Sequence, residues 1–394
     1  MYGIALEGGG ARGAYHIGAL KALMENGYKI TGAVGTSIGS FNAAMVAQGD
    51  FDKLYEYWTN LSSSDLFDID KGDLQKIVNK KIDMTLIKNV AEYVKVVASN
   101  KGMDVTKYKE LLEKLIDEDK LRKSKIDFGL ATVSLTDKKP VELYKEDIDE
   151  GMVASYIMAS SQLPVFKSEK VQEKVFLDGG FYNNCPVNLL VEKGYKDIIE
   201  IRTKAVGVYK KVKKAKDVNI ITIEPSGDLG SVLFADSELI NKNVKMGYYD
   251  ALRIIKGLAG NKYYINKLEK SVAFNIFMKL SDEQIYKIAK DTVKDVNQKE
   301  AKKVLFENIL LEIAKKIKLQ KANSYDELLI GIVEYLLAEE DLVELYNVYD
   351  LKQLILELKK NSSKMLKKEK ESIVRNPVKE MTIKLIKEIN IEEM

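Results

Sequence analysis

The sequence predicts an α/β protein with a mostly parallel central sheet, followed by an all-helical C-terminal region. In the first half of the chain, short apolar runs alternate with segments of helical periodicity, which is typical of a parallel sheet with helices on its faces. From about residue 229 onward, stretches rich in Lys, Glu, Leu and Ile follow one another and strand-like runs become rare. We therefore expect two domains, residues 1–228 and 229–394.

The expected elements of the first domain alternate along the chain. Strands are expected in short apolar runs, at residues 2–6, 30–34, 127–133, 175–177, 197–201 and 219–223. Helices are expected in the periodic segments between them, at residues 14–25, 41–47, 52–61, 85–98, 106–117, 152–160 and 187–192. Ligands of doubly wound sheets bind at the carboxyl ends of the strands, so we expect a functional site in the loops at that edge.

Composition restricts the class of protein. A hydrophobic content of 46% and a charged content of 31% describe a soluble globular chain, and the net charge of +3 gives no argument for nucleic-acid binding. Cys185 is the only cysteine, so we expect a buried structural thiol, no intrachain disulfide and a reducing compartment. The N-terminus lacks the pattern of a secretory signal, and no uncharged apolar run reaches about 18 residues. We therefore expect a cytoplasmic protein.

A glycine-rich loop follows the first expected strand and leads into a helix. Several backbone N–H groups of such a loop can converge on one anion, as in an oxyanion hole or a phosphate cradle. The same letters match the dinucleotide-binding pattern G-x-G-x-x-G, which needs an acidic residue about 20 positions further on. No Asp or Glu occurs between Glu25 and Asp50, which makes nucleotide binding a minor alternative. The loop consists of Gly8, Gly9, Gly10, Ala11, Arg12 and Gly13.

A second glycine motif contains a serine. Gly35, Ser37 and Gly39 form the pattern G-x-S-x-G between the second expected strand and a helix. The two glycines allow a tight turn that projects the serine hydroxyl out of the sheet, as in a nucleophile elbow. An ordinary glycine-rich turn has the same letters, so the pattern alone is weak. Its place at the carboxyl end of a strand, one βα unit after the glycine loop, favours Ser37 as a nucleophile.

Asp178, which precedes Gly179 and Gly180 after an apolar run, is the best-placed base for Ser37. We expect it at the same edge of the sheet, although an Asp-Gly turn that caps a loop has the same letters. The only histidine, His16, precedes Ser37, which excludes the Ser-acid-His order of α/β-hydrolases. His16 in another order is the alternative base, but a helix N-terminus disfavours its protonated form. A carboxylate can accept a serine proton when burial raises its pKa.

The glycine loop, the serine turn and the Asp-Gly-Gly sequence together resemble those of the patatin-like phospholipases. Residues 159–166, ASSQLPVF, look like the family segment that precedes the acid. Asn184 and Pro186 complete the family pattern D-G-G-x-x-x-N-x-P. The resemblance covers about the first 225 residues and implies a three-layer α/β/α sandwich with a mostly parallel central sheet. It says little about the C-terminal region, whose role stays open.

The resemblance also implies an activity. Ser37 would be the nucleophile and Asp178 the general base of a Ser-Asp dyad, with the N–H groups around Gly9, Gly10 and Ala11 as the oxyanion hole. The implied protein is a serine acyl hydrolase, a phospholipase A or lipid acyl esterase. It would work through an acyl-enzyme intermediate and need neither a metal nor a cofactor. The alternative is a catalytically weak lipid-binding or regulatory module.

Basic residues offer a route to a membrane. Residues 202–216 hold seven basic side chains and no acidic one, and the loop should leave the sheet at the edge that carries Ser37. We expect peripheral contact with anionic lipid at the inner membrane face, with a solvated loop as the equal alternative. Arg12 has two interpretations, a contact with an anionic phosphate head group or a salt bridge that braces the glycine loop. The lysines of the expected contact are Lys210, Lys211, Lys213 and Lys214.

Two helical segments are open to a second interpretation. Residues 359–388 carry ten basic and four acidic side chains, interleaved with Leu, Ile and Met and interrupted by Pro377. A helix on a membrane surface is one interpretation, and we favour a helix packed on its own domain with a charged outer face. Four residues of the helix expected at 85–98 belong either to an apolar wall at the mouth of the site or to the core: Leu86, Val90, Tyr93 and Val94.

Overall fold

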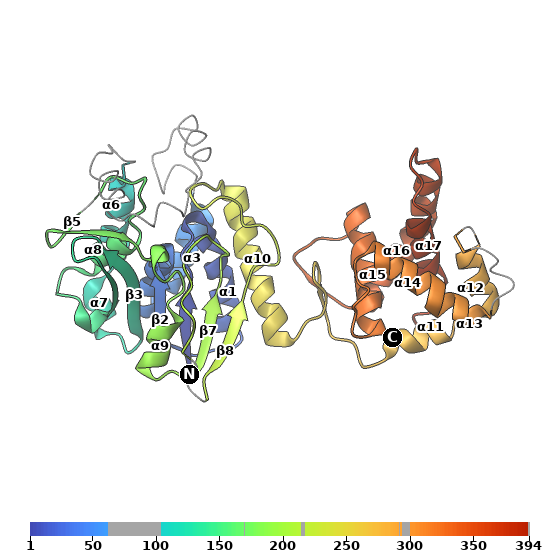
Figure 1. The fold of residues 1–394 in the computed structure, drawn as a ribbon, viewed down its shortest axis with the longest axis horizontal. Coiled ribbons are helices and arrows are strands. Elements are labelled where there is room, and N and C mark those ends of the chain that lie inside the picture. Colours follow the sequence, from blue (N-terminus) through green and yellow to red (C-terminus); the bar gives the residue numbers. More distant parts are fainter. Residues whose placement is uncertain (62–103, 169, 214–216, 291, 294–299, 393–394) are drawn as a thin grey trace. The chain divides into compact units, whose positions relative to one another are not determined.

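An eight-stranded sheet is the framework of the first half of the chain (Figure 1). The computed structural model describes all residues except 62–103, 169, 214–216, 291, 294–299 and 393–394. The strands are β1 Tyr2–Leu6, β2 Ile30–Thr36, β3 Asp127–Ser134, β4 Lys139–Tyr144, β5 Lys170–Val171, β6 Lys174–Asp178, β7 Asp197–Ile201 and β8 Asn219–Ile223. Their order is β5-β6-β3-β2-β1-β7-β8, with β4 also paired to β3. The strands β3, β2, β1, β7 and β8, in this spatial order, pair in parallel. β4 and β6 pair antiparallel with β3.

Helices cover both faces of this sheet, as the predicted three-layer α/β/α sandwich requires. The helices are α1 Ala14–Glu25, α2 Ile38–Ala47, α3 Phe51–Asn60, α6 Thr106–Leu115, α7 Glu118–Lys123, α8 Val153–Ser160, α9 Val187–Lys193 and α10 Ser237–Lys256. A side chain at Gly3 would meet Leu190 of α9, whereas one at Gly35 would meet Gly39 of α2. Gly35 pairs with Leu6 of β1, so these two residues face the same side of the sheet. Leu6 is an odd number of positions from Gly3, so it faces the side opposite to Gly3. Helices α9 and α2 therefore lie on opposite sides of the sheet.

All six strands expected from the sequence are present, with ends that differ by at most two residues. Six of the seven expected helices are present as well. The helix expected at 85–98, with its candidate apolar wall, lies outside the described residues. The sequence does not predict β4 or β5. Two of the six residues of β4, Lys139 and Pro140, are exposed, and among the described strands it pairs only with β3. It therefore lacks the apolar run of a central strand.

β6 reaches the functional edge from the direction opposite to β2. β3 extends beyond its pairing with β2, and residues 132–134 pair antiparallel with β6. The last residue of β6, Asp178, pairs with Thr132, and the neighbouring residue Ala131 pairs with Thr36 at the end of β2. The aspartate therefore lies at the edge that the sequence predicts, although its strand is antiparallel to the neighbour that brings it there.

The chain divides into two compact units, Met1–Leu252 and Arg253–Met394. The sequence places a division near residue 228, whereas the structure keeps most of α10 with the sheet. A side chain at Gly247 of α10 would overlap the backbone of Tyr15 in α1. The backbones of the two helices are therefore in contact. This contact explains why α10 as far as Leu252 belongs to the first unit.

Residues 253–394 form a helical unit with its own core. The helices are α11 Val272–Met278, α12 Asp282–Ala289, α13 Ala301–Val304, α14 Leu310–Lys316, α15 Tyr325–Glu340, α16 Leu351–Glu371 and α17 Pro377–Glu388, with a π-helical turn, Leu305–Ile309, between α13 and α14. A short parallel pair, β9 Tyr264–Ile265 with β10 Val348–Tyr349, is the exception to the all-helical prediction. Leu and Ile side chains of these helices form one buried cluster. Among the described helices, none combines the length and the apolar character needed to cross a bilayer.

Candidate active site

Ser37 occupies a strained turn between β2 and α2. Its backbone has φ 55° and ψ −130°, a combination that non-glycine residues rarely adopt. A side chain at Gly35 would overlap the backbone of Gly39, so the turn closes only with glycine at that position. The Ser37 N–H donates to Ser160 Oγ at 2.8 Å, and Ser40 Oγ donates to the Ser37 carbonyl at 2.6 Å. These contacts hold the serine at the carboxyl end of β2.

The Ser37 hydroxyl lies beside the Asp178 carboxylate and lowers the pKa of that carboxyl. Both residues are buried, with exposed fractions of 4% for Asp178 and 9% for Ser37. Burial raises the pKa of Asp178 to about 6, and hydrogen bonds from the Ser37 hydroxyl and from the Gly180 N–H, the latter at 2.7 Å, oppose the rise. Within the described residues, no cation contributes to this pKa shift. Such a carboxylate can accept a proton from the hydroxyl beside it.

Residues 159–166 connect the nucleophile turn to the strand of the aspartate. Ser160 Oγ accepts the Ser37 N–H and donates to a β3 carbonyl at 2.7 Å. Two residues later, the Gln162 carbonyl accepts the Asp178 N–H at 2.8 Å. The segment that the sequence marks only by its resemblance to a family is therefore a bridge that holds both side chains in register.

The glycine loop offers two unused amide donors. The N–H groups of Gly9 and Gly10 donate no hydrogen bond to any described residue. The sequence also predicts Ala11 among the oxyanion donors, but its N–H donates to the Val232 carbonyl at 2.8 Å. Gly10 has φ 53°, and a side chain there would overlap the same carbonyl. Gly13 ends the 3-10 turn that leads into α1. The candidate oxyanion donors of the loop are therefore the two amides of Gly9 and Gly10.

Asn184 joins the glycine loop to the turn that begins with Gly179 and Gly180. Its carbonyl accepts the Gly8 N–H at 3.0 Å, and its side chain fills the space that a Cβ on Gly8 or Gly180 would need. Its own N–H donates to the Val208 carbonyl at 2.7 Å, while the Val208 N–H donates to the Gly180 carbonyl at 2.8 Å. Three segments distant in sequence are thereby joined around one asparagine.

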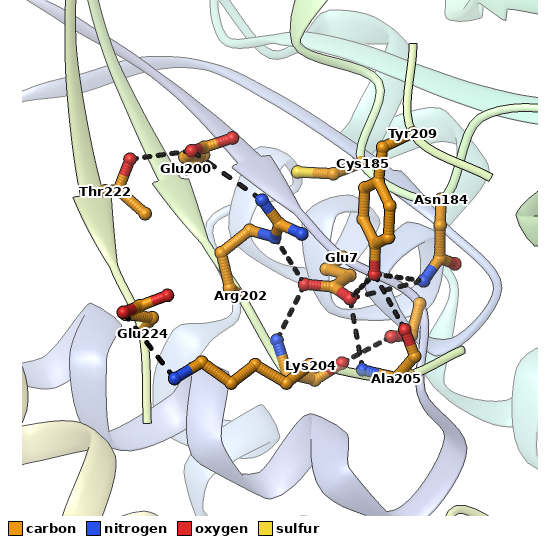
Figure 2. A network of polar contacts seen from close by, with 12 residues as sticks. Glu7, Asn184, Cys185, Glu200, Arg202, Lys204, Ala205, Tyr209, Thr222 and Glu224 are labelled. Carbon is orange, nitrogen blue, oxygen red and sulfur yellow. Dashed lines mark hydrogen bonds and ion pairs between the residues drawn. The ribbon is translucent and has the colours of Figure 1, made fainter. Parts of the chain in front are cut away.

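A fully buried carboxylate, Glu7, anchors the start of the glycine loop (Figure 2). Its donors come from the loop after β7 and from the Asn184 turn. Oε2 accepts Arg202 Nε at 2.7 Å and the Thr203 N–H at 2.9 Å; Oε1 accepts the Ala205 N–H at 3.2 Å, Asn184 Nδ2 at 3.3 Å and the Tyr209 hydroxyl. The Arg202 guanidinium lies 4.2 Å from the Tyr209 ring centroid, and burial together with Glu7 raises the pKa of Tyr209 to about 12.

Arg12 braces the same loops through backbone carbonyls. Its Nε donates to the Gly230 carbonyl at 2.8 Å, and its Nη1 donates to the carbonyls of Lys204 at 2.9 Å and Thr203 at 3.3 Å. Of the two interpretations from the sequence, the structure shows the brace, with carbonyl oxygens in place of the carboxylate of a salt bridge. The guanidinium thus connects the glycine loop to the loop after β7 and to the segment before α10.

The alternative base and the single thiol are both packed in the interior. His16 is fully buried, its Nδ1 lies 3.2 Å from Asn42 Nδ2, and burial lowers the pKa of His16 to about 3. The imidazole is therefore neutral at physiological pH and a weak base. Burial raises the pKa of Cys185 well above its usual range, as expected for a structural thiol. Across the described ranges, no three His, Cys, Asp or Glu side chains are arranged to hold a metal.

The residues that position the site are mostly absent from the sequence prediction. For Glu7 and Arg202 a signal exists, because Leu6 pairs with Ile201 and the two charged residues follow directly at the ends of adjacent strands. A charge at the end of an apolar strand needs a partner when it is buried. Ser160, Thr203 and Tyr209 carry no comparable signal, because their hydroxyl contacts exist only after the loops have folded.

Comparisons with known proteins agree with this arrangement of motifs. Residues 4–191 match the family model described as patatin-like phospholipase. Lysophospholipase NTE1 of Kluyveromyces lactis is 29% identical over 200 residues, which are 50% of this chain and 12% of that protein. A patatin-like phospholipase domain-containing protein of Caenorhabditis elegans is 28% identical over 204 residues, 50% of this chain and 13% of that protein. The match therefore spans only a small part of the length of these curated relatives.

Among solved structures, VipD from Legionella pneumophila aligns with 97% of this chain and 90% of its own chain. The sequence identity is 14% and the TM-score is 0.41. The assignment of the fold rests on the strand order and the two helical layers of this chain itself.

The Glu7 network makes a prediction about stability. Glu7→Gln leaves the Arg202 guanidinium, which is 25% exposed, without its closest counter-charge. We expect the free energy of unfolding to fall by about 1–3 kcal/mol, and the activity to fall as the glycine loop loosens. Urea denaturation and an esterase assay on the same preparations measure both effects.

Glu200→Gln is the matched control for this prediction. Glu200 approaches the same guanidinium at 3.9 Å and is itself 14% exposed. We expect its loss to cost less than about 1 kcal/mol, because the contact is longer and more hydrated. Equal destabilisation by the two substitutions would contradict the anchoring role of Glu7.

Proposed function

The chain carries a patatin-like phospholipase domain over residues 4–191, and from this premise we propose that the protein is a serine acyl hydrolase that acts on phospholipids or related acyl esters. Ser37 is the nucleophile and Asp178 is the general base. The observation that supports this most directly is the buried Asp178 carboxylate beside the Ser37 hydroxyl, with its pKa raised by burial. The same contact explains how a chain whose only histidine is His16 can activate a serine.

In the acylation step, Ser37 Oγ bonds to the acyl carbonyl carbon while its proton passes to Asp178. Negative charge develops on the carbonyl oxygen, and the unused amides of Gly9 and Gly10 are its donors. One such donor contributes ~3 to 4 kcal/mol to transition-state stabilisation. When the tetrahedral adduct collapses, the bond to the ester oxygen breaks, and this oxygen takes the proton from Asp178 and leaves as the alcohol or lysolipid.

In the deacylation step, water takes the place of the serine hydroxyl. The water oxygen bonds to the acyl carbon while Asp178 accepts a water proton, and the same two amides stabilise the second oxyanion. The bond to Ser37 Oγ then breaks, the fatty acid leaves, and Oγ regains the proton. Each step uses one proton and returns it, so the cycle needs no cofactor.

The environment of Asp178 suits it to this work. A carboxyl group with a pKa of about 6 is mostly ionised at neutral pH and is a stronger base than an ordinary aspartate. A nearby cation would stabilise the ionised form and weaken the base, and within the described residues none contributes. The strained backbone of Ser37 keeps the hydroxyl beside this carboxylate throughout the cycle.

Substitution of the dyad tests the proposal. We expect Ser37→Ala to abolish both ester hydrolysis and labelling by a fluorophosphonate, which reacts only with an activated serine. Asp178→Asn should lower kcat by about 100-fold to 10,000-fold, because the amide cannot accept the proton. His16→Gln is the control and should keep most of the activity once folding is verified by circular dichroism.

Two results would count against the proposal. A wild-type protein that a fluorophosphonate does not label would favour a lipid-binding module in which the motifs serve as scaffold. Greater loss of activity in His16→Gln than in Asp178→Asn, with both variants folded, would overturn the Ser-Asp dyad.

The pKa of Asp178 predicts the pH dependence of activity. The ionised carboxylate is the active form, so kcat/KM on a soluble ester should fall as the pH is lowered through about 6. The pH-rate profile, measured from about pH 5 to about pH 8 with Ser37→Ala as the blank, gives the midpoint. A midpoint near 4, the value of an ordinary aspartate, would show that Asp178 is not the buried base.

We further propose that the loop after β7 brings the site to anionic lipid. β7 is parallel to β1, so this loop leaves the sheet at the edge that carries Ser37. Lys210 and Lys211 are exposed, whereas Lys213 is paired with Glu192 at 2.8 Å. Lys214 lies outside the described residues. Lys210 Nζ lies 4.0 Å from the Tyr182 ring centroid, and Lys211 forms no ion pair with a described residue.

Vesicle pelleting tests this loop. We expect Lys210→Gln combined with Lys211→Gln to weaken binding to phosphatidylserine vesicles by about tenfold or more, because each near-surface base contributes roughly 1 kcal/mol. Lys123→Gln with Lys125→Gln is the matched control, because these exposed lysines precede β3 at the opposite edge of the sheet. If the loop variant binds the vesicles as well as the wild type does, the loop is a solvated connection that does not contact lipid.

A further inference from the structure

The connection between α16 and α17, residues 372–376, exposes two adjacent aliphatic side chains. Ile373 is completely exposed, at 103%, and Val374 is 80% exposed. Single aliphatic residues on a protein surface need no explanation, but here two neighbours stand almost free of protein contact at the end of a helical hairpin. Figure 1 shows α16 and α17 side by side within the C-terminal unit. We call residues 372–376 the tip.

Polar contacts hold both ends of the tip. Asn376 begins α17: its N–H donates to Glu369 Oε1 at 2.6 Å, and its Oδ1 accepts the Lys379 N–H at 3.2 Å. Glu369 and Lys379 are both buried, and Lys379 Nζ lies 3.8 Å from Glu369 Oε2 and 3.0 Å from Glu340 Oε1. At the other end, Ser372 Oγ donates to the Val374 carbonyl at 3.1 Å. The conformation of the tip is therefore set by buried polar contacts at its base.

The charges around the tip are mainly basic and partly uncompensated. Lys364, Lys370 and Arg375 are exposed and form no ion pair with a described residue. Lys367 pairs weakly with Glu371 at 3.9 Å. The tip thus combines an apolar end with a basic collar, which is the pattern of a segment that enters the head-group region of an anionic bilayer.

We propose that the tip inserts Ile373 and Val374 into the interfacial region of an anionic lipid bilayer, with Lys370 and Arg375 at the head groups. A stable protein interface needs about 20 to 30 residues on each side. A convex tip of five residues does not supply them, whereas a bilayer accepts such a tip without a complementary surface. This contact belongs to the C-terminal unit and goes beyond the acyl hydrolase activity proposed for residues 4–191.

The bodies of the two helices do not take part in this contact. Leu354, Leu358 and Met365 of α16 and Ile383 and Ile386 of α17 are buried in the core of the unit. The packed helix that we favour for residues 359–388 is therefore confirmed. Three large hydrophobic side chains of this hairpin are exposed: Leu356 on α16, at 50%, and the more exposed Ile373 and Val374 in the tip.

Vesicle partitioning of the full chain tests the tip. We expect Ile373→Asp combined with Val374→Asp to lower the partition coefficient on phosphatidylcholine–phosphatidylserine vesicles by about tenfold or more, because the variant loses both apolar anchors and gains repulsion. Leu311→Asp is the matched control, since Leu311 is an exposed aliphatic residue on α14, at 50%. Hydrolysis of a soluble ester should be unchanged in both variants, which separates failure of this contact from failure of the proposed activity.

Fluorescence gives a second, independent readout. The only tryptophan of the chain, Trp58, is fully buried, so Ile373→Trp adds the only exposed indole. Its emission should shift to shorter wavelength and be quenched by brominated lipid when anionic vesicles are added. Wild-type partitioning by the double aspartate variant, or no spectral change in Ile373→Trp, would overturn the proposal. So would loss of self-association by the aspartate variant in the absence of lipid, which would assign the tip to a second copy of the chain.

Discussion

The candidate active site depends on one buried charge, the carboxylate of Glu7. A carboxylate in the protein interior is tolerated only when hydrogen bonds and an opposite charge replace its hydration. For Glu7 these come from Arg202 at the end of the adjacent strand, from two amides of the loop after β7, and from Asn184 and Tyr209. Satisfying this one group therefore fixes the relative positions of the segments that surround the glycine loop.

The two buried carboxylates of the site have opposite environments, and the contrast separates structure from chemistry. Glu7 has five donors, one of them the Arg202 guanidinium, which compensate its charge and leave it suited to a structural role. Asp178 is equally buried, but it has only the Ser37 hydroxyl and the Gly180 amide, and burial raises its pKa to about 6. A carboxylate that is buried with few partners gains proton affinity, which a general base needs. The fold thus places a counter-charge beside the structural carboxylate, whereas within the described residues none contributes at Asp178.

Features that depend on neighbouring residues in the sequence could be predicted, whereas contacts between residues far apart in the sequence could not. The strands and the three glycine motifs could be predicted because apolar runs and glycine turns are local features. The antiparallel direction of β6 could not, because it depends on the extension of β3 beyond β2. The engagement of the Ala11 amide is likewise non-local, because its acceptor at Val232 lies far along the chain. From the residues alone, Asp178 is predictable only at the edge of the sheet, and its pairing with Ser37 is expected only through the resemblance to a family.

The same distinction applies to residues 359–388, whose charge pattern does not reveal the exposed aliphatic tip at residues 372–376. Counted over residues 359–388, the lysines look alike, but the folded unit buries Lys379 among carboxylates and leaves Lys370 and Arg375 to solvent. The reversal of the chain is specified by Asn376 and Pro377. Ile373 and Val374 add almost no packing to the described part of the unit, so its stability does not account for aliphatic residues there. Burial is the main physical benefit of an aliphatic side chain, and the proposed bilayer supplies the burial that the described residues do not give Ile373 and Val374.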